Sequence, residues 1–362
     1  MSKNPSFWVL SVLLLLSASF GVSSAHAAAP NAATFTDLGC LADGWYFHLK
    51  CSGTGSSRVC ELSQKQVIAP DSPDENDFAC WSDLSVGNTT KKGVRSALEE
   101  TTNDNNISKI VLTTSLNFGL HKITGTTSVC NLNVSPLGPN HAGFDGDGKV
   151  IWGLCYISMA QNSSFGLFEE FHGSFTNVTF DQAMVTASTG GILAIKLKDA
   201  NISDVTIKAS SVQGQFVGGL ASSVDVSDPL DPTNSTSSIT NVTFNSSLYL
   251  GAHKFRDNEG RVGGLFGVVN GGILSISDVT IGGVDASNYN FEESDDLKVG
   301  GLVGFVSNNS ELNVSNVSVE GKIQLSDQSY KNIGSVGGVF GASEASSLTI
   351  DNVTLKPVNF GS

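Results

Sequence analysis

Two aspartates in a glycine-rich segment are the first residues that suggest chemistry. Asp145 and Asp147 stand in the sequence G-F-D-G-D-G. Clustered carboxylates supply the acid and base of many polysaccharide hydrolases, a class to which parallel β-helix proteins often belong. The same glycine-rich setting is typical of a backbone corner. The pair is therefore a candidate catalytic site with a structural alternative.

Other catalytic patterns are missing from the sequence. His172 stands beside Gly173 with no evident partner, so we expect its side chain to be solvated. The chain contains no Ser-His-Asp order, no HExxH motif and no EF-hand loop. We therefore predict no catalytic residues, and we keep a polysaccharide-degrading β-helix enzyme only as an alternative hypothesis.

A segment that combines aromatic and acidic residues is the candidate binding site. It lies in an insertion from Gly283 to Lys298, and a second insertion runs from Val224 to Ser238. Insertions in a repeat protein leave the stack as surface loops, where binding residues concentrate. An aromatic pair followed by carboxylates suits a sugar or calcium, while a solvated loop is the alternative. The candidate ligand-binding residues are Tyr289, Phe291, Glu292, Glu293, Asp295 and Asp296. We predict no cofactor or bound metal, with calcium left open.

These segments interrupt a repeated phrase of the type Ile-Thr-Asn-Val-Thr-Phe. Its central position is always Asn or Asp, and from Asn241 onward it recurs every 36 to 38 residues. A fixed period of this length indicates a stacked repeat protein. The central residues of the six copies are Asn177, Asp204, Asn241, Asp278, Asn316 and Asn352.

The phrase predicts a bent strand. Ile239 and Val242 are three residues apart, so in a straight strand they would face opposite sides. A corner at Asn241 turns both inward, and Asn and Asp are the non-glycine residues that most readily adopt the left-handed conformation of a corner. We expect the corner side chains to share hydrogen bonds along the stack. Parallel crossovers are usually right-handed, so the expected fold is an all-β, right-handed parallel β-helix, or β-solenoid, from about Ser108 to Leu355.

A second phrase, V-G-G-L-x-G, keeps step with the first. It occupies 262–267, 299–304 and, with Val in place of Leu, 336–341. We expect its glycines to sit at a positive-φ turn where backbones stack closely, and the large residues that follow to fill the interior.

Together with the segment F-x-G-x-G-x-x-I-x-G-L at 144–154, these phrases resemble the bacterial GLUG-type repeat proteins. The resemblance covers about 106–362. It implies a solenoid in an exported, adhesin-like surface protein, and it brings no catalytic motif.

The N-terminal third differs in composition. Residues 1–27 have the charged start, apolar run and Ala-His-Ala site of a secretory signal peptide. Residues 28–105 form a cysteine-containing region that ends in an amphipathic helix from Gly93 to Thr102, placed to cap the first coil. An even cysteine number in an exported chain predicts disulfides, with a metal site as the alternative, although the spacings lack the close pairs of zinc sites. The cysteines are Cys40, Cys51, Cys60, Cys80, Cys130 and Cys155.

The net charge and the predicted export limit the classes of partner that the protein can have. The net charge of −14 argues against nucleic acid or anionic lipid as a partner. After signal removal no apolar stretch reaches the length of a transmembrane helix. Many Asn-x-Ser/Thr sequons fall on the corner phrase, which favours a bacterial protein over a eukaryotic glycoprotein. We therefore expect a non-enzymatic, secreted or cell-surface scaffold that contacts a glycan or another cell-envelope component, with a carbohydrate-binding module as the alternative.

Overall fold

The structure is a computed structural model of the chain. The residues it describes are 41, 45–54, 57–67, 73–86, 89–103, 107–118, 136–138, 142–158, 160–225, 236–245, 249–252, 259–286, 296–307, 309–325, 333–356 and 359–360.

The secondary structure of these residues is almost entirely β, with α1 as the one helix among them, and most of the strands belong to long parallel sheets. The largest sheet contains β1 (Trp45–Ser52), β2 (Arg58–Gln66), β3 (Asp77–Phe78), β6 (Ile107–Leu112), β7 (Leu116–Asn117), β8 (Gly143–Trp152), β11 (Phe168–Asp181), β14 (Ala194–Lys208), β17 (Ala221–Asp225), β18 (Thr236–Phe244), β21 (Phe266–Asn270), β22 (Gly272–Ile281), β25 (Val303–Val306), β26 (Ser310–Val319), β29 (Phe340–Ser343) and β30 (Ser347–Leu355).

Smaller sheets complete the coils. One contains β10 (Ser164–Phe165), β13 (Thr189–Gly190), β16 (Phe216–Gly218), β20 (Glu259–Gly263), β24 (Asp296–Gly300) and β28 (Ile333–Gly337). Another contains β9 (Cys155–Ile157), β12 (Met184–Thr186), β15 (Ser211–Gly214) and β19 (Tyr249–Ala252). The remaining two contain β23 (Val284–Ala286), β27 (Ile323–Leu325) and β31 (Asn359–Phe360), and the hairpin strands β4 (Leu84–Val86) and β5 (Thr89–Lys91).

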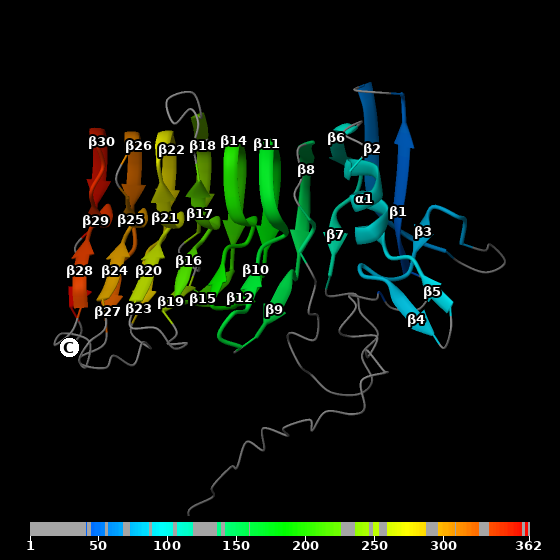
Figure 1. Ribbon diagram of the computed structural model, residues 1–362, viewed down its shortest axis with the longest axis horizontal. Helices are drawn as coiled ribbons and strands as arrows, with labels where there is room; N and C mark the ends of the chain where they lie inside the picture. The colour runs from blue at the N-terminus through cyan, green and yellow to red at the C-terminus, as the bar shows by residue number, and fades with distance from the viewer. Residues whose placement is uncertain are drawn as a thin grey trace, which may run out of the picture. The chain divides into compact units, whose positions relative to one another are not determined.

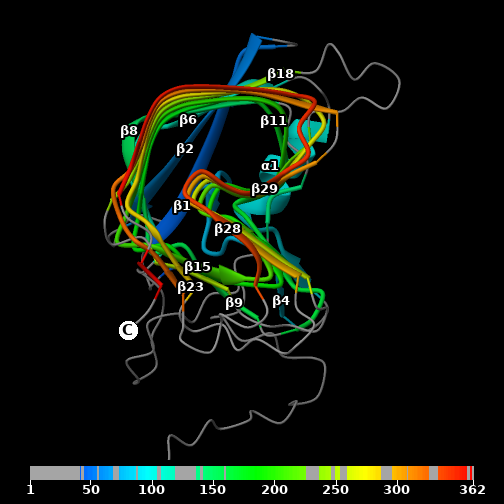
Figure 2. The ribbon, with the colours of Figure 1, turned by 90° about the vertical axis from the view of Figure 1, so that its left-hand side faces the viewer.

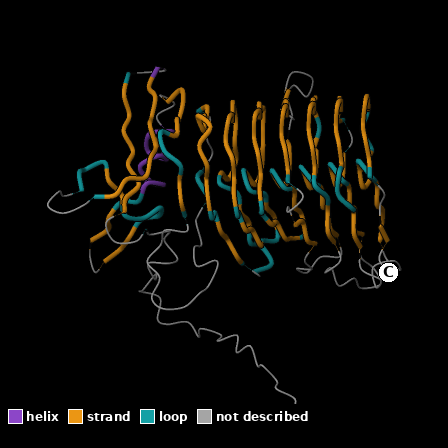
Figure 3. The backbone as a smooth tube through the Cα atoms, turned by 180° about the vertical axis from the view of Figure 1, so that it is seen from behind, coloured by secondary structure: helices purple, strands orange, loops and turns teal. Residues whose placement is uncertain are grey.

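From β8 onward, most strands pair in parallel with the equivalent strand of the next coil. The series β11, β14, β18, β22, β26 and β30 shows this most clearly, since each phrase aligns residue for residue with the next. Figures 1 and 3 show these strands side by side along the stack. The described chain therefore has the long parallel sheets of a β-helix or solenoid, as the repeat period predicts.

A left-handed corner lies in every copy of the first phrase. The φ angles of the six central residues, from Asn177 to Asn352, lie between 48° and 60°. Ile276 and Val279 on either side of Asp278 are both buried, whereas Asp278 is exposed. Figure 2, viewed along the stack, shows the coils following one another around the same bends. The bent-strand prediction is confirmed.

Side chains of neighbouring corners form hydrogen bonds with a fixed direction. Asn241 donates from Nδ2 to Asp204 Oδ1 at 2.6 Å, and Asn316 donates to Asp278 Oδ1 at 3.0 Å. Asn352 donates in turn to Asn316 Oδ1 at 2.7 Å. Each amide thus donates to the preceding coil, as expected for stacked corners. An ionised Asp has no donor, so Asp278 cannot continue the series toward Asn241.

The glycine phrase packs closely but by a different backbone conformation from the one expected. None of its paired glycines in the last three copies has positive φ, so the predicted left-handed turn is wrong at these positions. The close approach is present. A Cβ at Gly263 would lie 2.7 Å from the Gly304 nitrogen and 2.8 Å from the Val303 Cα. Glycine is therefore needed here for space between coils rather than for φ.

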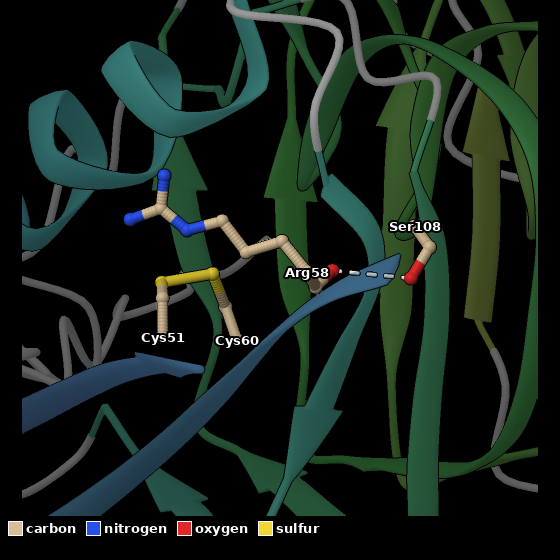
Figure 4. The surroundings of a disulfide bond; sticks show 4 residues. All are labelled: Cys51, Arg58, Cys60 and Ser108. Atoms are coloured by element: carbon tan, nitrogen blue, oxygen red, sulfur yellow. Dashed lines mark hydrogen bonds between the residues drawn. A yellow bond between two sulfur atoms is a disulfide. The ribbon is translucent and has the colours of Figure 1, made fainter. Parts of the chain in front are cut away.

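The N-terminal region is more regular than its sequence suggests. β1 and β2 form an antiparallel hairpin, and β2 also pairs in parallel with β6, which joins the hairpin to the coils. Cys51 and Cys60 are opposite each other in this hairpin and form a disulfide (Figure 4). Figure 4 also shows the Ser108 hydroxyl donating to the Arg58 carbonyl at 3.1 Å, across the junction between β2 and β6.

Every described cysteine is oxidised. Besides the Cys51–Cys60 pair, Cys80 and Cys155 are disulfide-bonded. Cys40 and Cys130 lie outside the described residues. The disulfide prediction is confirmed for the four described cysteines.

The N-terminal aromatic residues form a core. Phe47 and Trp81 are buried, their rings lie 5.7 Å apart, and Phe118 packs against both. Helix α1 (Val94–Asn103) follows and buries Val94 and Leu98. The helix is therefore where the amphipathic pattern places it.

The inward apolar side chains of the last coil are more exposed than their equivalents in the coil before it. Leu348 and Ile350 of β30 are 42% and 48% exposed. Their partners in β26, Leu312 and Val314, are at most 1% exposed because β30 lies beside them. The inward apolar side chains of β26 are therefore buried by the coil that follows it.

We expect Val279→Asp to destabilise the protein by about 3 kcal/mol or more, because Val279 is 1% exposed and the new carboxylate would have no partner between coils. Thr280→Asp, one residue further along on the outer side, is the matched control and should change stability little. Urea denaturation followed by circular dichroism measures both. Equal midpoints for the two variants would contradict the inward orientation of Val279.

We expect Asp278→Asn to raise the free energy of unfolding by up to about 1 kcal/mol, since the new amide can donate to Asn241 Oδ1. Asp278→Ala should lower it by about 1–2 kcal/mol, because Ala disfavours positive φ and accepts no hydrogen bond from Asn316. Thermal and urea unfolding test the pair. If both variants are less stable than the parent to the same degree, the hydrogen bonds between corner side chains do not contribute to stability.

Candidate functional site

The two candidate catalytic aspartates lie at the corner of β8. Asp147 has φ 48°, so the glycine-rich segment is a corner, as its alternative interpretation predicted. Asp145 Oδ2 pairs with Lys109 Nζ at 2.7 Å, and Asp145 Oδ1 accepts the Asp147 amide at 2.8 Å. Burial acts to raise the pKa of Asp145, but Lys109 and the Asp147 amide together hold it below its usual value.

Asp147 is also paired. Its Oδ2 lies 3.1 Å from Lys149 Nζ. Each carboxylate thus has its own lysine, and Asp145 is held ionised. This arrangement fits a structural corner, in which both carboxylates are used in ion pairs.

His172 belongs to a series of ion pairs that spans three coils. Its Nε2 lies 2.5 Å from Glu170 Oε1, so the expectation of a solvated, unpartnered histidine is wrong. Lys196 Nζ lies 3.2 Å from Glu170 Oε2 and 3.3 Å from Asp225 Oδ2. Burial acts to raise the pKa of Glu170, but His172 and Lys196 lower it overall. The residues come from β11, β14 and β17, and parallel register brings them together.

Among the described residues, the most buried cationic side chain belongs to a cluster that sequence reasoning missed. The Arg261 side chain is 8% exposed and donates from Nη1 to the carbonyls of Gly260 at 2.9 Å and Asp296 at 2.6 Å. Its Nη2 lies 3.2 Å from Asp296 Oδ2 and 3.6 Å from Glu259 Oε2. The guanidinium therefore joins β20 to β24 through both backbone and side chain.

A second cation and an aromatic ring complete this group. Lys298 Nζ lies 3.1 Å from Asp296 Oδ2 and 4.6 Å from the centre of the Phe305 ring. Arg261 Cζ lies 5.3 Å from the same ring centre. We call Glu259, Arg261, Asp296, Lys298 and Phe305 the Arg261 cluster. Cation–π contacts of this kind add stability where the cation is partly desolvated.

The Arg261 cluster marks the end of the insertion that carries the candidate binding residues. Asp296 is the first residue of β24, and of the six candidates it is the one the structure describes. Burial acts to raise its pKa, but Lys298 and Arg261 together lower it. Tyr289, Phe291, Glu292, Glu293 and Asp295 lie outside the described residues. Asp296, near the C-terminal end of the insertion, is therefore held by Arg261 and Lys298.

A signal for this cluster was present in the sequence. Arg261 and Lys298 both immediately precede the Val-Gly-Gly of the second phrase, so they occupy the same position in successive coils. The period alone could have placed them in one column. Phe305 could not have been added in this way, because its contact depends on how β25 folds back against β24.

One further group has the ligand types of a metal site. His48 Nδ1 lies 2.7 Å from Asp77 Oδ1 and 3.8 Å from Asp74 Oδ1. Lys65 Nζ, however, lies 2.8 Å from Asp77 Oδ1 and 3.1 Å from Asp74 Oδ2. Hydrogen bonding to Lys65 is the main cause of the lowered pKa of Asp74. Because an ammonium already occupies the place of a cation, we assign no metal to this group.

The described residues define the class of this protein as a parallel β protein built from stacked coils. Among them, no helix has the length and hydrophobicity needed to cross a bilayer.

Comparisons with known proteins do not define the protein more closely than this class. No family model matches the chain, and no curated protein matches it in sequence. One solved structure that it resembles is a "putative immunoglobulin A1 protease" from Bacteroides ovatus, with 20% sequence identity, 70% of each chain covered and a TM-score of 0.49. A likeness of this size carries no argument about activity.

We expect Asp296→Asn to lower the free energy of unfolding at neutral pH by about 1 kcal/mol. The carboxylate is 46% exposed and therefore partly screened, but its loss weakens the pairing of a buried guanidinium. The lowered pKa of Asp296 means that its contribution is present above the unfolded pKa of about 4 and is lost as the pH falls below that value.

The difference between parent and variant should therefore shrink toward pH 3. Urea midpoints measured from pH 7 to pH 3 test this, with Glu320→Gln at an exposed position as the control. A difference that stays constant with pH would show that the charge of Asp296 is not the cause.

Proposed function

We propose that this chain is an exported, adhesin-like repeat scaffold with GLUG-type coils, which holds its inserted segments toward a glycan or another cell-envelope component. The observation that carries the proposal is the anchoring of the insertion. Residues 287–295 connect β23 to β24, and Asp296 at their C-terminal side is bonded to the buried Arg261. Such an anchor holds the base of a loop on a rigid frame, which is how binding loops are usually supported.

The pairing of carboxylates also supports a scaffold over an enzyme. Asp145, Asp147 and Glu170 each have a lysine partner within 3.2 Å. We infer ion pairs that hold neighbouring coils and corners together. A polysaccharide-degrading enzyme remains the alternative, and substitutions of these same carboxylates test it.

Several structural details belong to the proposal. We propose that the coils wind in a right-handed sense, that α1 caps the first coil, and that residues 1–27 direct export. In support, α1 immediately precedes the first strand of the coils, β6, and buries one face against the core. The four oxidised cysteines suit an oxidising compartment outside the cytosol.

Retention on cell-wall polysaccharides tests the function. We expect the parent to be retained and to release no sugar products, and retention to be lost when 287–295 are replaced by a short Gly-Ser linker. The linker variant keeps Asp296 and Lys298, so the Arg261 cluster stays intact. Measurements with calcium and with chelator show whether the carboxylates of this segment act through a cation.

Asp145→Asn and Asp147→Asn are the controls for the enzyme hypothesis. They should leave retention unchanged. Product release that disappears in these variants would replace the scaffold proposal with the enzyme. Retention that survives removal of 287–295 would move the binding surface elsewhere.

A further inference from the structure

The last coil presents an open strand edge. Its strands are β28, β29, β30 and β31, and among the described residues each of them pairs only with the coil before it. Figure 1 shows β30 at the end of the row of parallel strands. One edge of β30 therefore carries backbone N–H and C=O groups that no other described strand pairs with.

Apolar side chains lie along the same edge. Three of them in β30 are 42% to 48% exposed, whereas their partners in β26 are at most 2% exposed. The exposed side chains are Leu348, Ile350 and Leu355. Within the stack, the equivalent side chains are buried by the strand of the next coil. The edge of β30 thus offers both the hydrogen-bonding groups and the apolar surface that a further strand would cover.

The features that usually keep an exposed edge from pairing are missing from β30. Proteins commonly place lysine or proline in such a strand, or keep the strand very short. From Ser347 to Leu355, β30 has nine residues with no lysine and no proline, and Asp351 is its one charged residue. The corner is no obstacle, because β26 has the same corner and pairs on both sides.

The sequence of β30 indicates which strand fits its edge. The segment L-T-I-D-N-V-T-L at 348–355 has the same order of apolar and polar residues in both directions. Two copies can therefore run antiparallel about a two-fold axis that passes between Asp351 and Asn352. Residues directly opposite each other then share one face of the sheet. The pairs across the axis are Leu348 with Leu355, Thr349 with Thr354, and Ile350 with Val353.

The central pair of this arrangement is also complementary. Asp351 and Asn352 are both exposed. Asn352 uses one Nδ2 hydrogen for the bond to Asn316 Oδ1, which leaves its second hydrogen for another acceptor. An ionised Asp351 only accepts hydrogen bonds, so Asn352 of each copy can donate to Asp351 of the other. The two-fold axis produces this contact twice.

We propose that two copies of this chain associate through their β30 edges as a symmetric dimer. The large sheet of one copy continues into that of the other, and the exposed apolar side chains are buried between the two last coils. Both copies use the same surface, so the association closes at two. This inference goes beyond the proposed function and does not depend on it, because it uses β30 and none of the inserted segments.

Sedimentation velocity of the full chain over a range of concentrations tests the dimer. We expect a concentration-dependent species with twice the mass of one chain. Asn352→Asp places a carboxylate opposite Asp351 of the other copy, and it should weaken the dimer about tenfold or more at neutral pH. The double variant Asp351→Asn with Asn352→Asp exchanges donor and acceptor, and it should restore the dimer of the parent.

Asn316→Asp is the matched control, because it makes the same change at the corner of the coil before. Like Asn352→Asp, it removes one hydrogen bond between corners, so an effect on folding alone would appear in both variants. It should keep the dimer of the parent. Circular dichroism melting shows that each variant is folded. Ile350→Lys, which places an ammonium opposite Val353 of the other copy, is a second disruption and should also weaken the dimer.

A parent that sediments as a single chain at every concentration overturns the inference. Species that keep growing beyond two copies also overturn it, because they would show strand pairing without two-fold symmetry. A loss in Asn352→Asp that the double variant does not reverse would show that Asp351 and Asn352 do not pair across an axis. Retention on polysaccharide is measured on Asn352→Asp and on the linker variant of 287–295, so failure of one proposal is visible separately from failure of the other.

Discussion

The left-handed backbone at one residue of each coil determines the arrangement of everything around it. With Asp278 at φ 55°, residues on both sides of the corner direct apolar side chains to one interior. A β-branched or large residue could adopt this conformation only at a cost of about 1–2 kcal/mol, so the corner stays Asn or Asp in all six copies. Because the corner fixes which residues point inward, it also fixes the outward columns. The core and the outer surface are thus two results of one constraint.

The sequence was sufficient for the parts of the fold that repeat. The phrase around Asn241 predicts the corner, the buried positions and the side-chain hydrogen bonds because each copy adds evidence for the same local geometry. The N-terminal hairpin was missed because β1 and β2 occur once, and their pairing depends on contacts distant in sequence. The positions of the glycines in the second phrase were predicted correctly. The reason for them was not, because lack of space between backbones and a need for positive φ both select glycine.

Charged side chains were the least predictable part of the candidate site. His172 pairs with Glu170 two residues before it in the same strand, and Lys196 of the next coil pairs with the other oxygen of Glu170. Arg261 reaches Asp296 in the same way. Parallel stacking places residues 26 to 37 positions apart on adjacent strands in these two pairs of strands, so a charge can be paired by the coil next to it. Asp145 thus pairs with Lys109 of the neighbouring strand β6, whereas Asp147 pairs with Lys149 two residues further along its own strand.

The same stacking limits where function can reside. Inward positions are used by the core, as the exposure of Leu348 and Ile350 in the last coil shows by contrast with Leu312 and Val314. Corner positions are restricted by φ, and the glycine phrase by the approach of backbones. What remains free to vary is the outward columns and the segments inserted between strands. Insertions suit a ligand with an individual shape, whereas a column repeats one chemical group at one spacing. A column can therefore recognise only a partner that is itself periodic, whereas the inserted segments suit the glycan that we propose as their partner.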